Sequence, residues 1–290
     1  LQTHIDTLRR NSIGGIIKYI RLGDLTNAEV PNLTIETQRK IVSVIEKSEK
    51  ALILREQQIE ALSALKQSVF LDMFGDPVKN PNNFNKTSLG EIIEVLTDYH
   101  SDGSYKTLRE NVELLDEENF ALMVRTTDLQ HNNFSEGVKY IDELAYEFLE
   151  KSKVFGGEII INKIGSAGKV YLMPFLNRPT SLGMNQFLIR INDKSSNEFI
   201  YRQLKIKTME NEIQKRVRGA VTKTITKDAI RSIDVILPPY EQQICFINKI
   251  NEITDFISSL EASLKKLSIL YDSLLHKAFN GELFKEKIKA

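Results

Sequence analysis

Residues suited to catalysis are few and scattered in this chain of 290 residues. The histidines are His4, His100, His131 and His276. They are too far apart in sequence to show metal-ligand spacing. The Gly-rich stretch 165–170 resembles a phosphate-binding loop in composition only, because its spacing differs and Val170 stands where Ser or Thr would hold magnesium. The sequence therefore predicts no catalytic centre and no metal or cofactor on this chain.

A second stretch, Leu237–Tyr240, shares its Pro-Pro-Tyr with the active-site motif of DNA amino-methyltransferases. In that motif an Asn or Asp accepts a hydrogen bond from the target amino group, and Leu237 has no polar side-chain atom that could do so. No Gly-rich cofactor loop of the usual methyltransferase form precedes it. We therefore expect no methyl transfer by this chain.

Local charge points to binding instead. The 39 Lys and Arg residues balance 39 Asp and Glu residues, so any attraction to nucleic acid must come from local clustering. Segment 108–150 is acidic, and segment 202–231 is basic with a Gly-bearing turn at Gly219–Thr224. A basic face in a neutral protein indicates phosphate binding. A solvated helix face without a partner is the alternative.

Two groups of residues are candidates for DNA contact. Candidate phosphate contacts are polar or basic residues at turns where glycine lets the backbone approach a duplex. They are Lys163, Lys169, Arg216, Arg218 and Lys223, and Ser166 is a further candidate for DNA contact. Candidate base readers have donors and acceptors of fixed geometry, since Arg can bridge guanine and Asn or Gln can bridge adenine. They are Arg125, Thr127, Asn185 and Gln186. For the last two, a cap at the start of a strand is the alternative.

Two long amphipathic segments frame these residues, and they are copies of each other. Placing Gln38 over Gln243, an offset of 205 (243 − 38), aligns them without a gap. In the second copy, apolar residues occupy the a and d positions of successive heptads. They are Ile250, Ile253, Ile257, Leu260, Leu264, Leu267, Tyr271 and Leu274. We predict helices over 34–73 and 241–279 that pack antiparallel as a coiled coil; two core helices of an ordinary globular domain are the alternative.

The repeat also extends in front of the first helix, since 9–30 aligns with 214–235. The region between the helices shows strand signals beginning at Glu158, Lys169, Asn185 and Ile233, with helical patches at 142–153 and 196–217. The predicted fold class is α+β. The predicted domains are 1–31, the tail of a preceding domain; 32–77, the first helix; 78–237, a mixed α/β domain; and 238–290, the second helix and tail. With no run of eighteen apolar residues and no signal peptide, we expect a cytoplasmic protein that does not enter a membrane.

Short motifs follow one another along the chain: Glu36-Thr37-Gln38, Leu89–Ile92, Arg125–Leu129, Gly157–Ile160 and Pro238–Gln243. In the order of these motifs, the chain resembles the DNA-specificity subunit of type I restriction-modification enzymes. The resemblance covers nearly the whole chain. It departs from the family where Phe84 replaces a usual Trp, and where the first target-recognition domain is missing except for its tail.

The resemblance implies a non-catalytic reader of double-stranded DNA. A full subunit has two target-recognition domains, each reading half of a split site, and its helices form a spacer that docks the modification subunits. Those methyltransferase subunits carry S-adenosylmethionine, and a restriction subunit uses ATP-Mg. This chain would read one half-site, either as a fragment or as a half-length subunit that forms a homodimer. The competing hypotheses are a methyltransferase or nuclease subunit with its own catalysis, and a coiled-coil scaffold without DNA binding.

Overall fold

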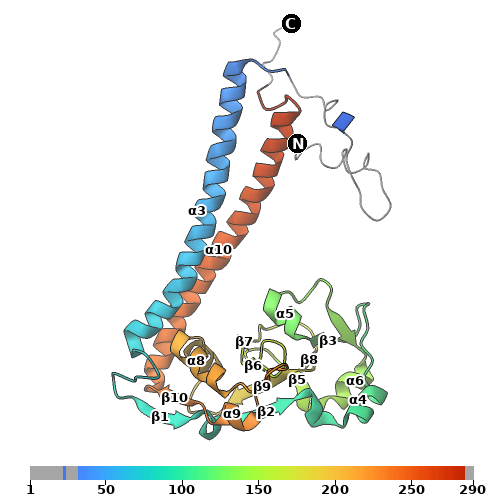
Figure 1. The fold of residues 1–290 in the computed structure, drawn as a ribbon, viewed down its shortest axis with the longest axis vertical. Coiled ribbons are helices and arrows are strands. Elements are labelled where there is room, and N and C mark those ends of the chain that lie inside the picture. Colours follow the sequence, from blue (N-terminus) through green and yellow to red (C-terminus); the bar gives the residue numbers. More distant parts are fainter. Residues whose placement is uncertain (1–21, 24–31, 285–290) are drawn as a thin grey trace. The chain divides into compact units, whose positions relative to one another are not determined.

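The computed structural model describes residues 22–23 and 32–284 (Figure 1). The predicted tail 1–31 otherwise lies outside the described residues. Two long helices, α3 (Ile35–Phe74) and α10 (Tyr240–Phe279), have 40 residues each and confirm the predicted helices to within a residue. The chain divides into two units, one containing residues up to 64 and from 253 onward, the other residues 65–252. Among the described residues, no helix combines the length and the apolar character needed to span a bilayer.

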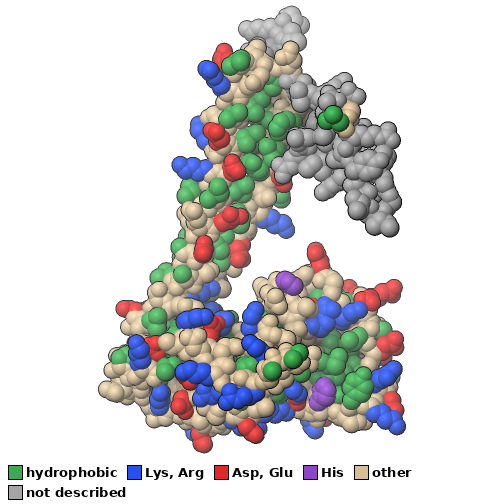
Figure 2. All heavy atoms as spheres, viewed as in Figure 1, with side chains coloured by type: hydrophobic (Ala, Val, Ile, Leu, Met, Phe, Trp, Pro, Cys, Tyr) green, Lys and Arg blue, Asp and Glu red, His purple; other side chains and the backbone are tan. Residues whose placement is uncertain are grey.

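In the first unit, the predicted heptad positions face away from solvent. On α10, Ile257 and Leu260 are buried, and the later a and d residues are at least half-buried. On α3 the half-buried a and d residues are Ile45, Ser48, Leu52, Arg55, Ile59 and Leu62. Ile45 and Ala278 line one hollow, so the start of α3 lies beside the end of α10, as antiparallel packing requires. Figure 2 shows apolar side chains along these helices with charged ones beside them.

In the second unit, a cluster of four phenylalanines joins the other ends of both helices. Phe70 and Phe74 from α3, Phe246 from α10 and Phe199 from α7 (Asn197–Leu204) are buried. Their ring centroids lie 5.1 to 6.0 Å apart in tilted or edge-to-face pairs. After Phe74 the helix ends at Gly75, which adopts a φ of 73°.

The rest of the second unit is built on three sheets. One four-stranded sheet has the order β2 (Ile93–Asp98), β9 (Gln186–Ile191), β6 (Ile159–Asn162) and β7 (Val170–Leu172). The other has the order β4 (Lys139–Ile141), β3 (Ala121–Val124), β8 (Thr180–Leu182) and β5 (Lys153–Val154). All pairs in these two sheets are antiparallel except β3 with β8. A third pair joins β1 (Asn85–Ser88) to β10 (Asp234–Leu237).

Strand β3 shows how the layers stack. Successive side chains of a strand point to opposite faces. Leu122 and Val124 join a core shared with the other sheet, whereas Ala121 and Met123 pack among residues of helices on the opposite face. Those helices are α4 (Tyr105–Asn111) and α6 (Glu143–Phe148). The remaining helices are α5 (Thr126–His131), α8 (Lys207–Arg216) and α9 (Lys227–Arg231), with short 3-10 turns at Leu89–Glu91, Tyr99–Asp102 and Glu150–Ser152.

The α+β class is therefore confirmed, and the strands predicted near Glu158, Lys169, Asn185 and Ile233 are β6, β7, β9 and β10. The helical patch predicted over 196–217 is two helices, because the chain takes an extended conformation at Ile206 between α7 and α8. The short strands of the second sheet, which are two to four residues long, were not predicted from the sequence.

Replacing Leu260 by Ala tests the seam between the helices. The buried side chain leaves a cavity when it is shortened, so we expect the free energy of unfolding to fall by about 2–5 kcal/mol. Urea unfolding followed by the helical circular dichroism signal measures it. Leu270→Ala is the matched control, since Leu270 lies on the same helix and is 53% exposed. If both variants lost the same small amount of stability, position 260 would not lie in a packed seam.

Candidate nucleic-acid interface

The connection from β6 to β7, residues 163–169, is a tight hairpin turn. Gly165 and Ser166 adopt φ values of 69° and 59°, which reverse the chain within a few residues. The side-chain amide of Asn162 donates to the Gly165 carbonyl over 3.1 Å and holds the turn closed. A strand follows rather than a helix, in agreement with the prediction that this Gly-rich stretch is not a nucleotide-binding loop.

A second loop, Arg218–Thr224, which we call the finger loop, lies against this hairpin turn. Arg218 and Thr224 exchange two backbone hydrogen bonds of 2.8 and 2.7 Å at its base. Gly219 has a φ of 105°, and a side chain there would place its Cβ 2.1 Å from the Thr222 carbonyl oxygen, so only glycine fits. Thr224 also bridges to Ile164, which joins the finger loop to the hairpin turn.

These contacts bring six of the ten candidate residues into one surface. The carbonyl of Asn185, at the start of β9, accepts a 2.7 Å hydrogen bond from the Lys163 backbone N–H and so joins the same group of segments. The six residues are Lys163, Ser166, Lys169, Asn185, Arg218 and Lys223. All of them except Lys163 are exposed. We call this surface the loop face.

Gln186 does not belong to the loop face. Its side chain is fully buried. With its amide oriented to satisfy both neighbours, it donates to the Val124 carbonyl over 2.9 Å and accepts from the Thr126 N–H over 3.1 Å. The side chain therefore ties β9 to the end of β3, and its burial leaves it no access to a base edge. We withdraw it as a base reader; the prediction erred because a polar strand residue can face inward when the core supplies partners.

Two basic candidates are held by acidic partners. Arg216 is paired with Glu212 over 3.2 Å and donates to the Ser232 carbonyl over 3.0 Å, which fixes α8 to the end of α9. Lys163 is paired with the buried Asp98 over 2.9 Å. Both side chains therefore serve contacts within the unit, and neither is a free cation for a phosphate.

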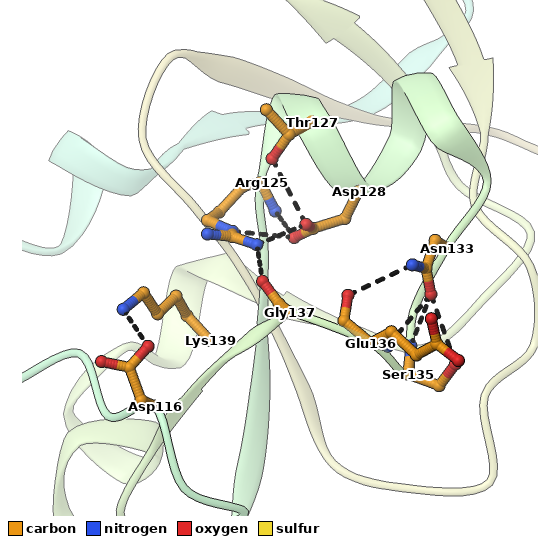
Figure 3. A network of polar contacts seen from close by, with 9 residues as sticks. All are labelled: Asp116, Arg125, Thr127, Asp128, Asn133, Ser135, Glu136, Gly137 and Lys139. Atoms are coloured by element: carbon orange, nitrogen blue, oxygen red, sulfur yellow. Dashed lines mark hydrogen bonds and ion pairs between the residues drawn. The ribbon is translucent and has the colours of Figure 1, made fainter. Parts of the chain in front are cut away.

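Arg125 is likewise engaged, as Figure 3 shows. Its guanidinium donates to both carboxylate oxygens of Asp128 over 3.1 and 2.7 Å, and to the Gly137 carbonyl over 2.6 Å. Asp128 also accepts from the Arg125 backbone N–H over 2.8 Å, which caps the first turn of α5. Thr127, one residue into α5, remains exposed. The Arg125 side chain positions α5, and Thr127 is the more accessible of the two.

A cavity of about 290 Å³ adjoins the loop face. Three of the four candidate base readers, Arg125, Thr127 and Asn185, line it together with Tyr99 and Met184. Asn185 therefore lies at the junction of this cavity and the loop face. Sequence analysis did not select Tyr99, which belongs to the site only through the pairing of β2 with β9, or Met184, the chain neighbour of Asn185.

Most cations of the basic segment 202–231 are neutralised locally. The paired residues are Arg202, Lys205, Lys207, Lys215, Arg216, Lys227 and Arg231, whose partners are Asp or Glu. Figure 2 accordingly shows basic side chains mixed with acidic ones on the visible face of this unit. On the loop face, Lys169, Arg218 and Lys223 have no carboxylate partner among the described residues. Within the basic segment, the cations open to a ligand are thus Arg218 and Lys223, both on the loop face.

The family model for the type I restriction modification DNA specificity domain matches residues 81–269, more than half of the chain. The chain belongs to this family. That membership confirms the prediction that it is not an enzyme, because type I specificity domains carry no catalysis. In the part of the chain that the structure describes, no cluster of three or more His, Cys, Asp or Glu residues could hold a metal.

The specificity domain also has relatives in curated sequences and solved structures. The type I restriction enzyme MjaX specificity subunit of Methanocaldococcus jannaschii is 23% identical over 273 residues, covering 89% of this chain and 60% of that protein. The chain thus spans about three fifths of the length of this relative. The type I restriction-modification S subunit from M. genitalium has a similar fold (TM-score 0.54, 17% identity, covering 96% of this chain and 70% of that one). So does a chain from a structure of type I R-M complex assembly and conformational transition (TM-score 0.63, 18% identity, covering 97% and 68%).

Behind the loop face of the specificity domain lies a charge cluster centred on Asp98. Its carboxylate is paired with Lys163 and Lys227, each over 2.9 Å, and accepts from the Ser101 hydroxyl over 2.8 Å. Both ammonium groups also lie over the ring of Phe187, at 5.3 and 5.9 Å. Burial, the largest single influence, raises the pKa of Asp98, but the hydrogen bonds from Lys163, Lys227 and Ser101 outweigh it and lower that pKa to about 2.

Asp98→Asn tests this cluster through its pH dependence. Because the pKa is lowered from 3.8 in the unfolded chain to about 2 in the fold, the carboxylate stabilises the fold above about pH 4, and that contribution is lost as the pH falls toward 2. We expect the variant to be less stable by about 2 kcal/mol at neutral pH, and the gap to wild type to close between about pH 4 and pH 2. Urea unfolding at several pH values measures it.

Asp228→Asn is the control for this prediction. Asp228 carries the same charge and pairs with Arg231, but its side chain is 92% exposed, so its removal should change stability little at any pH. A gap between Asp98→Asn and wild type that stayed constant down to about pH 2 would contradict the assignment, because protonation would then have no effect on the cluster.

Proposed function

We propose that this specificity domain reads the DNA sequence of one half of a bipartite site as part of a type I restriction-modification complex. The observation that carries the proposal is the loop face, on which two backbone-linked loops and Asn185 present exposed polar and cationic groups in a chain of this family. The described residues supply groups for binding rather than for bond cleavage. We also keep the expectation that the protein works in the cytoplasm, where its DNA target lies.

Residues of the loop face and of the adjoining cavity serve affinity and specificity in this proposal. Lys169, Arg218 and Lys223 are exposed cations that contact backbone phosphates, which position a protein without reading sequence. Thr127 and Asn185 carry exposed hydrogen-bonding groups at the adjoining cavity and read base edges. Asn185 is well suited to this, because its φ of 69° and its strand-start position fix the direction of its side chain.

The long helices serve assembly in this proposal. Ile53 and Leu54 on α3 and Phe256 on α10 are about half exposed, although each lies on a helix that buries its seam. Apolar groups left exposed on such helices support their docking to modification subunits, which would carry S-adenosylmethionine, while ATP-Mg would belong to a restriction subunit. The chain itself would bind neither.

Selection of duplexes from a random library by the purified chain tests the proposal. A sequence reader enriches one short motif over several rounds, because each correct base contact adds about 1–3 kcal/mol. Binding without any enriched motif would mean that the chain is attracted to DNA phosphates but does not read sequence. No binding at low salt would remove the DNA-reading role altogether and favour a scaffold.

Lys223→Ala tests the loop face as the phosphate contact. Each neutralised phosphate contributes about 0.9 to the slope of log affinity against log salt concentration, so the variant should lose about that much slope and weaken equally on all sequences. Affinities over a salt series measure it. Lys215→Ala is the matched control, because Lys215 is 70% exposed in the same basic segment but paired with Glu212. Equal slopes for both variants would move the DNA face elsewhere.

Two copies of the chain would rebuild a reader with two-fold symmetry, and we propose that it assembles in this way. A closed two-fold pair presents two loop faces, so its target would be an interrupted palindrome. Light scattering at tens of micromolar should give the mass of two copies, either alone or with modification subunits. A mass that corresponds to one copy of the chain under both conditions would exclude the two-fold pair.

A further inference from the structure

The tip of the finger loop carries an apolar side chain in open solvent. Val221 is 97% exposed, the highest value among the exposed large hydrophobic residues that the structure describes. It lies between Arg218 and Lys223, two cations of the loop face without a carboxylate partner among the described residues. Single exposed apolar residues are common on protein surfaces, so exposure alone assigns no role. The shape and surroundings of the finger loop indicate a role for Val221.

The backbone fixes the position of Val221. The paired backbone bonds between Arg218 and Thr224 close the loop, and the requirement for glycine at 219 sets its path. Val is β-branched and therefore nearly rigid at χ1. The tip thus presents two methyl groups in a defined direction. The repeated segment carries the same pattern, because Gly14, Ile16 and Lys18 stand 205 positions before Gly219, Val221 and Lys223. Both copies combine a β-branched apolar residue with a lysine two positions later.

The width of this element selects the groove that it can enter. The finger loop is itself a short two-stranded ribbon, because Arg218 and Thr224 pair across its base, and Thr224 also bridges to Ile164 of the hairpin turn. Neighbouring backbones in such a ribbon lie about 4.8 Å apart before side chains are added. The minor groove of B-DNA is about 6 Å wide, whereas the major groove, at about 12 Å, admits a two-stranded ribbon. The finger loop therefore fits the major groove.

The major groove offers an apolar side chain one suitable partner. Its base edges are hydrogen-bond donors and acceptors, apart from the C5-methyl group of thymine. Placing the Val221 methyls against a polar edge would remove water without replacing its hydrogen bonds. We propose that Val221 reads a thymine in the half-site by contact with its C5-methyl group, while Arg218 and Lys223 hold the flanking phosphates. This inference rests on the proposed DNA-reading function and names one base that it recognises.

Replacement of thymine by deoxyuridine tests the contact, because it removes only that methyl group. In the duplex enriched by the wild-type chain, each thymine is replaced in turn and the affinity is measured. We expect one position at which wild type loses about fourfold, the ratio that corresponds to about 0.8 kcal/mol for one buried methyl group. Val221→Ala should bind the thymine and uracil duplexes equally at that position. Val221→Ile, which introduces the residue of the other copy, should keep the discrimination.

The control and the contrary outcomes distinguish failure of the Val221–thymine contact from failure of the proposed DNA-reading function. Leu144→Ala, at an 82% exposed position on α6, should keep the wild-type ratio. A thymine-to-uracil ratio that is unchanged in Val221→Ala would overturn the Val221 contact. So would an enriched site at which every uracil duplex binds as tightly as its thymine counterpart, although the DNA-reading function would then stand. If wild type enriched no sequence, the function would fail and the thymine contact with it.

Discussion

The packing of four phenylalanines between α3, α7 and α10 is the contact on which the second unit, residues 65–252, depends. Two of these helices are separated by more than 160 residues of chain, from Phe74 to Tyr240. The rings of Phe70, Phe74, Phe199 and Phe246 meet at edge-to-face distances and are excluded from water. Each fully buried ring contributes roughly 1.5–3 kcal/mol. The cluster therefore holds together the two helix segments through which the chain enters and leaves the unit. The strands of the sheets lie between these segments in sequence.

Electrostatics in this protein are organised locally rather than by net charge. The basic segment would look like a strong anion-binding face if its charges were free, yet most of its Lys and Arg residues lie beside carboxylates. The exposed pairs among these contribute little to stability, but all of the pairs reduce long-range attraction. The cations of this segment that have no carboxylate partner among the described residues, Arg218 and Lys223, are on the loop face. For a reader of sequence this arrangement is useful, because non-specific attraction to phosphates competes with discrimination between bases.

The loop face depends on buried groups that never reach its surface. Asp98 fixes Lys163 and Lys227 beneath the hairpin turn, Gln186 ties β9 to the end of β3, and Asp128 holds Arg125 at the first turn of α5. Each of these polar groups is buried and satisfied, which makes the backbone around it rigid. Asn185, Thr127 and the finger loop are consequently exposed residues on a fixed support. Residues that look like DNA readers in the sequence thus divide into a supporting layer and an exposed layer.

The sequence by itself determined the long helices, the strands β6, β7, β9 and β10, and the family resemblance. These features are encoded locally or by repetition: a heptad of Ile and Leu, a β-branched run between glycines, and an offset of 205 that aligns two copies. Tertiary structure decided which of the ten candidate residues are accessible. Four candidates have the residue types of DNA contacts, but their side chains are engaged by other residues of the protein: Gln186, Arg125, Lys163 and Arg216. Some of these partners, such as Asp98 for Lys163, are distant in sequence. Short strands such as β5 and β8 could not be predicted because they too depend on distant partners. Two or three residues form a strand only when a neighbouring strand supplies their hydrogen bonds.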